Sequence, residues 1–200
     1  NINKFTDYWS NTVGFFTVSR PHEELIIDSR LIAKTTLQEI DETLSTKDDW
    51  QLLADEISTN IILLDLAQKE KIKSQEKIQL ILDHITFDTC SPLEAAKKYS
   101  QFIFENFKYV KGITNVETRV DEILEFRSGV CQDFAHVLLQ LLRTIDIPSR
   151  YVSGYICPNK NGMRGEGATH AWIDAYIPRL GWIGLDPTNN CFANEHHIQL

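Results

Sequence analysis

Long hydrophobic runs are missing from this sequence of 200 residues: the longest, residues 61–64, ends at Asp65. A helix needs about 20 largely apolar residues to span a bilayer, so no membrane-spanning segment is expected. Basic residues are scarce as well, because 20 Lys and Arg stand against 28 Asp and Glu and leave a net charge of −8. Proteins that bind nucleic acids usually carry a basic face, so nucleic acid is not an expected partner.

Cysteine is sparse and shows no paired spacing. The four cysteines, at positions 90, 131, 157 and 191, include no Cys-x-x-Cys motif of zinc or redox sites. The two histidines His196 and His197 lack carboxylate or cysteine partners at ligand spacing, so we expect no metal and no cofactor. No secretory signal is visible, and reduced thiols are typical of the cytoplasm, which is the expected location.

What remains is an ordinary globular composition, 42% hydrophobic and 24% charged, whose pattern changes near residue 40. Residues 12–20 and 23–35 are rich in β-branched and aromatic residues and predict two strands of a small β unit within residues 1–40. Residues 41–200 predict one α+β domain, with helices first and an antiparallel sheet after them.

Apolar side chains at helical spacing, from Trp50 to Leu64, predict one helix that begins after Asp48. Ser91 and Pro92 have the residue types of a helix start. Further helices are expected over residues 118–126 and 131–145, and strands over residues 149–156, 168–177 and 181–186.

Cys131 opens the most buried of these helices. With Ser128 as the N-cap, Cys131 would be the third helical residue, beside free backbone N–H groups and the positive end of the helix dipole. That position stabilises a thiolate, and the same N–H groups could hold an oxyanion. Gly129 would allow a substrate close to the backbone. The alternative interpretation is a small buried thiol that serves only the core.

A thiolate nucleophile needs a base, and the base needs an orienting group. On the two strands around Pro178, His170 and Asp186 fall on one face, and a hairpin with His170 opposite Asp186 would bring them together. The alternatives are a structural histidine at a strand end and an Asp-Pro turn.

Four motifs carry a resemblance to a known family: R-S-G-V-C-Q-D-F-A-H, I-P-S-R-Y-V-S-G-Y, T-H-A-W-I-D-A-Y and G-W-I-G-L-D-P-T-N-N. In this order, over about residues 93–190, they resemble the transglutaminase-like superfamily, and more narrowly its bacterial branch, often labelled cysteine proteases. The segment S-R-P-H-E-E-L is similar to the small β region that precedes the core in that branch. The resemblance implies that the opening strand of this region would be expected before Asn1.

The resemblance implies a papain-like, transglutaminase-core fold of the α+β class, a buried helix with an N-terminal cysteine packed on an antiparallel sheet. It implies Cys131 as nucleophile, His170 as general base and acid, and Asp186 as the residue that orients His170. The N–H of Cys131 is the expected oxyanion donor. We expect three further residues to contact the substrate: Gln132, Tyr155 and Trp172.

The predicted activity is cysteine-dependent acyl transfer that cleaves an amide or peptide bond of a peptide, a protein or a small amide. Transfer to an amine, which is transglutaminase activity, is the alternative outcome of the same site. A non-catalytic binding module with this fold is a second alternative. A redox-sensing thiol is a third, with Cys157 as the candidate resolving cysteine.

Overall fold

The computed structural model describes residues 2–9, 11–28, 30, 32–36, 39–115, 117–157, 162–165 and 169–200. The chain divides into two compact units, Asn1–Ala33 and Lys34–Leu200. The boundary predicted from the sequence pattern, near residue 40, lies a few residues later. Each unit is described by itself.

The first unit contains an antiparallel hairpin of β1 (Asn3–Thr6) and β2 (Thr12–Phe15). Asp7 closes its turn, because the carboxylate accepts hydrogen bonds from the backbone N–H groups of Trp9 and Asn11. The second strand predicted over residues 23–35 is wrong for every residue described there. Residues 12–15 instead pair with residues 3–6, because the Asp7 turn reverses the chain between these two segments.

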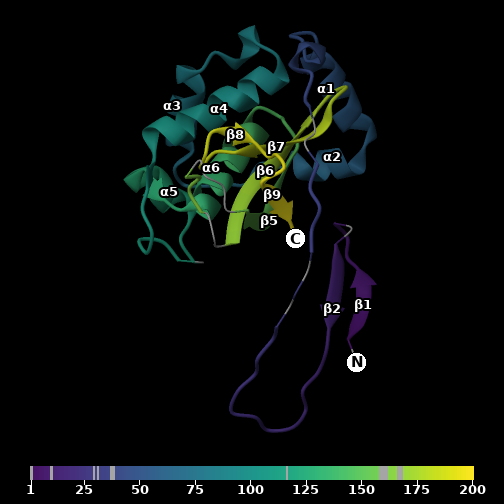
Figure 1. Ribbon diagram of the computed structural model, residues 1–200. Coiled ribbons are helices and arrows are strands. Elements are labelled where there is room, and N and C mark those ends of the chain that lie inside the picture. Colours follow the sequence, from purple (N-terminus) through teal and green to yellow (C-terminus); the bar gives the residue numbers. More distant parts are fainter. Residues whose placement is uncertain are drawn as a thin grey trace. The chain divides into compact units, whose positions relative to one another are not determined.

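The helices of the second unit come first, as predicted (Figure 1). They are η1 (Glu42–Leu44), α1 (Asp49–Thr59), α2 (Ile61–Leu66), α3 (Gln75–His84), η2 (Phe87–Thr89), α4 (Pro92–Asn106), α5 (Val120–Phe126) and α6 (Cys131–Thr144). None of those in the described part of the chain is long and apolar enough to cross a bilayer.

Two of these helices show how local chemistry sets helix ends. The single helix expected from Trp50 to Leu64 is two helices, because the Asn60 side chain accepts from the N–H groups of Ile62 and Leu63 and starts α2. Ser91 caps α4 as predicted, by accepting from the N–H of Glu94 at 3.2 Å.

The strands of the second unit form two sheets. A short parallel pair joins β3 (Lys108–Tyr109) to β4 (Ser128–Gly129). The main sheet is antiparallel, in the order β8-β7-β6-β5-β9, and its strands are β5 (Ser149–Ile156), β6 (Thr169–Ile177), β7 (Gly181–Asp186), β8 (Cys191–Phe192) and β9 (His197–Gln199).

The hairpin of β6 and β7 has a different register from the predicted one. Asp174 pairs with Gly184 and Ile173 with Leu185, so His170 is not directly opposite Asp186. The reason is the turn: residues 178–180 form a three-residue loop that closes on Gly181 at φ 76°, a conformation that glycine adopts without strain. The shift is two residues, so His170 and Asp186 keep a common face and become diagonal neighbours.

The core lies around α6. This helix contacts β5 and β6 on one side and the helices α3, α4 and α5 elsewhere (Figure 1). Phe134, Leu138 and Leu141 of α6 are completely buried, as are Ile173 and Ala175 of β6. The predicted architecture, a buried helix that begins with a cysteine and packs on an antiparallel sheet, is therefore confirmed.

Candidate active site

Cys131 is the first residue of α6, with Val130 as the N-cap, so the predicted N-cap at Ser128 is wrong. Ser128 and Gly129 are strand residues, and their pairing with β3 leaves one residue before the helix. The carboxylate of Asp133 caps the helix start by accepting from the Val130 N–H at 2.7 Å. Cys131 therefore lies in the first turn, where the helix dipole favours a negative charge.

Gly129 has a different role from the predicted one. A Cβ at this position would lie 2.5 Å from Oδ2 of Asp133, so the glycine makes room for the capping carboxylate rather than for a substrate. Thr114 donates to the same oxygen at 2.6 Å and holds it in place.

Two backbone amides at the start of α6 stay open. The N–H groups of Asp133 and Phe134 donate to the carbonyl of Val130. Among the described residues, the N–H groups of Cys131 and Gln132 make no hydrogen bond, as expected for the first turn of a helix. The N–H of Cys131 thus remains available as the predicted oxyanion donor.

His170 and Asp186 form a buried pair. Nε2 of His170 lies 2.8 Å from Oδ2 of Asp186, and both side chains are fully shielded from solvent. The diagonal placement on β6 and β7 thus brings together the two residues that the sequence pattern singles out. Asp186 also shapes the turn after β7, because Oδ1 accepts from the Thr188 N–H at 2.8 Å.

The second nitrogen of His170, Nδ1, is buried and makes no hydrogen bond of ordinary geometry within the described part of the chain. Cys131 nonetheless contributes to the electrostatics of the ring. Burial disfavours the charged imidazole, but the interactions with Asp186 and Cys131 outweigh it and raise the pKa of His170 from 6.5 to about 9. Asp186 and Cys131 therefore both favour the charged form of the His170 ring.

Asp186 is held as a carboxylate. Burial would raise its pKa, but hydrogen bonds from His170, His197 and Asn189 outweigh burial and lower the pKa of Asp186 below its usual value of 3.8. Asn189 donates from Nδ2 to Oδ2 at 2.7 Å. Sequence reasoning missed both Asn189 and His197, although Asn189 stands in the D-P-T-N-N motif.

A short segment before β6 lies against the imidazole. Gly165 has φ +90°, and a Cβ there would lie 2.5 Å from Nδ1 of His170. Asn189 anchors this segment, because its side chain accepts from the Arg164 N–H at 2.7 Å and donates to the Arg164 carbonyl at 3.1 Å. Gly165 therefore lies directly against the His170 ring, whereas Glu166 and Gly167 lie outside the described residues.

The comparison with known proteins bears directly on this geometry. Residues 81–187, more than half of the chain, match the family model of the transglutaminase-like superfamily. The chain belongs to the transglutaminase-like superfamily. The predicted fold class, a papain-like transglutaminase core, is confirmed by the solved structure described next.

The superfamily relatives are mostly longer than this chain. An uncharacterized protein of Mycobacterium leprae is 30% identical over 203 residues, which cover 98% of this chain and 70% of that protein. A crystal structure described as a putative cysteine protease from Cytophaga hutchinsonii has a TM-score of 0.57 and 25% identity, and covers 68% of this chain and 45% of that one. A protein-glutamine gamma-glutamyltransferase of Pseudomonas aeruginosa is 34% identical over 73 residues, 34% of this chain and 11% of that protein. The chain therefore spans less than half the length of the last two.

The three candidate substrate contacts of this superfamily member differ in burial and in their neighbours. Gln132 follows Cys131 in α6 and is half-buried. Tyr155 is 42% exposed on β5. Trp172 is buried on β6 between His170 and His197, with its ring stacked on the first and edge-on to the second. This position favours a packing role for Trp172, whereas Gln132 and Tyr155 remain predicted contacts.

A metal could be held by the group of His170, Asp186 and His197, whose ligating atoms lie within 4.8 Å of one another. No carboxylate stands at ligand spacing from His197 in the sequence, but the fold brings Asp186, eleven residues earlier, into contact with it. The N···O distances of 2.8 and 3.1 Å are those of direct hydrogen bonds, so we assign hydrogen bonding to these atoms.

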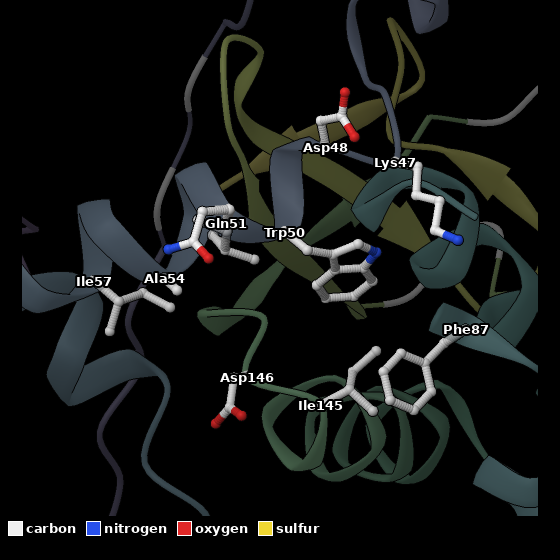
Figure 2. A pocket seen from close by; sticks show the side chains of 10 residues that line it. Lys47, Asp48, Trp50, Gln51, Ala54, Ile57, Phe87, Ile145 and Asp146 are labelled. Carbon is white, nitrogen blue, oxygen red and sulfur yellow. The ribbon is translucent and has the colours of Figure 1, made fainter. Parts of the chain in front are cut away.

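A cavity of about 650 Å³ lies beside the C-terminal end of α6, where Ile145 and Asp146 line it (Figure 2). Trp50, Phe87 and Ile145 form its apolar wall, with Lys47 and Asp146 at its rim. A helix rises about 1.5 Å per residue, so the length of α6 separates Ile145 from Cys131 by roughly 20 Å. This cavity is therefore not part of the candidate active site.

Proposed function

We propose that this member of the transglutaminase-like superfamily is a cysteine-dependent acyl-transfer enzyme that cleaves amide or peptide bonds. The observation that carries the proposal is the buried His170–Asp186 pair, which leaves Nδ1 of His170 for Cys131 at the start of α6. A cysteine, a histidine that moves its proton and a carboxylate that orients the histidine are the parts that acyl transfer needs.

The reaction follows from these roles. The Cys131 thiolate attacks the substrate carbonyl, and the oxyanion that forms lies near the N–H of Cys131. The C–N bond then breaks, His170 gives its proton to the leaving amine, and an acyl thioester remains on Cys131. His170 next takes a proton from water, the hydroxyl adds to the thioester, and the acid leaves as the thiolate is restored. Asp186 keeps the imidazole in the orientation that both proton transfers require.

The test is cysteine alkylation by iodoacetamide at several pH values, read for each cysteine by peptide mass spectrometry. Cys131 should react at about pH 6 at least tenfold faster than half-buried Cys157, because only a thiolate is a good nucleophile. Cys191 should be slowest among the partly exposed thiols, since burial, followed by the charge of Asp186, raises its pKa to about 12. The variant His170→Ala should lose most of the advantage of Cys131. Equal rates for Cys131 and Cys157 would instead favour a binding module.

Transfer to an amine is the second candidate outcome, favoured by the similarity to the Pseudomonas glutamyltransferase. The two outcomes differ in their products. A glutamine-containing peptide mixed with a primary amine should yield the free acid if water is the acceptor, and a substituted amide if the amine is. We expect hydrolysis, because transfer to an amine needs a second binding site for a lysine side chain, and no sequence motif indicates one.

A further inference from the structure

Asp186 binds a second histidine that the proposed reaction does not use. Nε2 of His197 lies 3.1 Å from Oδ2 of Asp186, the same oxygen that His170 contacts. The His197 side chain is 1% exposed. A buried polar side chain is costly unless it is hydrogen-bonded, so this contact accounts for the position of His197.

The path of the chain explains how His197 reaches Asp186 from the far edge of the sheet. Between β8 and β9, the N–H of Ala193 donates to the carbonyl of Gly184 on β7. A few residues later the carbonyl of His196 accepts from the N–H of Cys157, which follows β5. The segment thus crosses the sheet from β7 to β5 and delivers His197 beside the His170–Asp186 pair.

Hydrogen bonding defines which nitrogen of His197 carries the proton. Two groups of Asn194 lie 3.2 Å from Nδ1 of His197: the backbone N–H, which can donate, and the side-chain Oδ1, which can accept. Nε2 faces Oδ2 of Asp186, and an ionised carboxylate oxygen can only accept, so Nε2 carries a proton. Nε2–H therefore points at Asp186.

The carboxylate of Asp186 is surrounded by donors. Oδ2 accepts from His170, His197 and Asn189, and Oδ1 accepts from the backbone N–H groups of residues 188 and 189. Titratable and charged groups from several elements surround Asp186 and His170. They are His170 on β6, His197 on β9, Cys131 on α6, Cys191 on β8, Tyr109 on β3 and Arg164 before β6. His170 and His197 therefore share one oxygen of Asp186, to which Asn189 also donates.

We propose that His197 is a positioning residue for the acyl-transfer reaction: its Nε2–H holds Oδ2 of Asp186 where this oxygen aligns His170 with Cys131. The inference rests on the proposed function of Cys131, His170 and Asp186. It adds a fourth side chain that touches neither the thiol nor the substrate and acts through Asp186.

The test compares His197→Gln with His197→Met. The glutamine amide can donate from nearly the position of Nε2, whereas methionine has a similar length and no donor. His196→Gln is the matched control, because His196 lies next in sequence and its side chain pairs with Glu195 instead. Two readouts are used: the alkylation rate of Cys131 at pH 6, and the titration midpoint of His170 followed by NMR.

In His197→Met we expect alkylation of Cys131 to slow by about tenfold, because loosened catalytic geometry is costly in rate. The His170 midpoint should rise by about half a pH unit, since a carboxylate that loses one donor stabilises the imidazolium more strongly. His197→Gln should restore both values toward those of the wild type, and His196→Gln should change neither.

Several results would overturn the proposal. Equal slowing in the Gln and Met variants with an unchanged His170 midpoint would indicate packing alone. Bound zinc whose chelation reproduces the Met phenotype would make His197 a metal ligand. Nitrogen-15 NMR of the wild-type protein reports which ring nitrogen of His197 carries the proton. A proton found only on Nδ1 would leave Nε2 unable to donate to Asp186 and would overturn the proposal. If wild-type Cys131 reacts no faster than Cys157, the proposed function fails, and the His170 midpoint still reports whether His197 acts on Asp186.

Discussion

Gly165 shows at the scale of one residue how little space surrounds the His170 imidazole. Replacing Gly165 by alanine should slow alkylation of Cys131 by about tenfold or more, because misplacement of a reacting group by an ångström can cost about a hundredfold. The new Cβ would meet Nδ1 of His170 at 2.5 Å, so the ring or the segment must move. The rate of Cys131 alkylation at pH 6 measures the effect.

Gly162→Ala is the matched control for this prediction. Gly162 also has a left-handed backbone, at φ +67°, but a Cβ there meets nothing within 4 Å. Both variants carry the cost of a left-handed alanine, about 1–2 kcal/mol. An equal loss of reactivity in both variants would show that backbone strain, not contact with His170, is responsible.

At the residue scale, local sequence patterns single out the three residues of the proposed reaction. Cys131, His170 and Asp186 are each identified by a local pattern, a cysteine at a helix start and polar residues in alternating strands. His197 has no such pattern, because the residue that explains it lies on another strand. Its role depends on a crossing segment that no local periodicity predicts.

At the scale of elements, α6 depends on Asp133 for its first turn. Asp133→Ala should lower the free energy of unfolding by about 1–2 kcal/mol, the usual cost of a lost helix cap. The carboxylate accepts from Val130 N–H and Thr114 Oγ1, and both donors would lose their partner. Urea unfolding measures the change, and alkylation should slow as well because Cys131 follows Val130.

Asp83→Ala, on the exposed face of α3, is the control and should change the free energy of unfolding by less than about 0.5 kcal/mol. A loss at Asp133 no larger than this would show that the pairing of β3 with β4 holds the start of α6 without the cap.

Element boundaries show the same division between local and non-local causes. The start of α4 is predictable because Ser91 and Pro92 act on their own helix. The start of α6 is not, because Ser128 pairs with Lys108 on a strand distant in sequence and cannot serve as the cap. The register of β6 and β7 follows from the turn at residues 178–180, which the hydrophobic pattern leaves undetermined by two residues.

At the scale of the whole molecule, the buried charges link stability to pH. The raised pKa of His170 stabilises the fold fully below about pH 6.5, and this contribution is lost as the pH rises through about 9. The lowered pKa of Asp186 contributes above its usual value of 3.8 and is lost as the pH falls below it. The difference in unfolding free energy between wild type and His170→Gln should therefore shrink from pH 6 to pH 10.

Thermal or urea unfolding of the two proteins at a series of pH values measures this difference. Asp186→Asn, which removes the first favourable cause of the His170 shift, should flatten the dependence above pH 6.5. A difference that stays constant across this range would mean that His170 titrates at an ordinary value in the folded protein.

The sequence by itself determined the class of the fold and the three residues of the proposed reaction, because alternation, helical spacing and cap chemistry act over a few neighbouring residues. The tertiary structure alone decided the partners of those residues. Asp186 meets His170 diagonally because a turn sets the register, Gly165 lies on the imidazole because Asn189 anchors its segment, and His197 reaches Asp186 because the chain crosses the sheet. Such contacts join residues far apart in the chain, and only the closed packing of the domain brings them within hydrogen-bond distance.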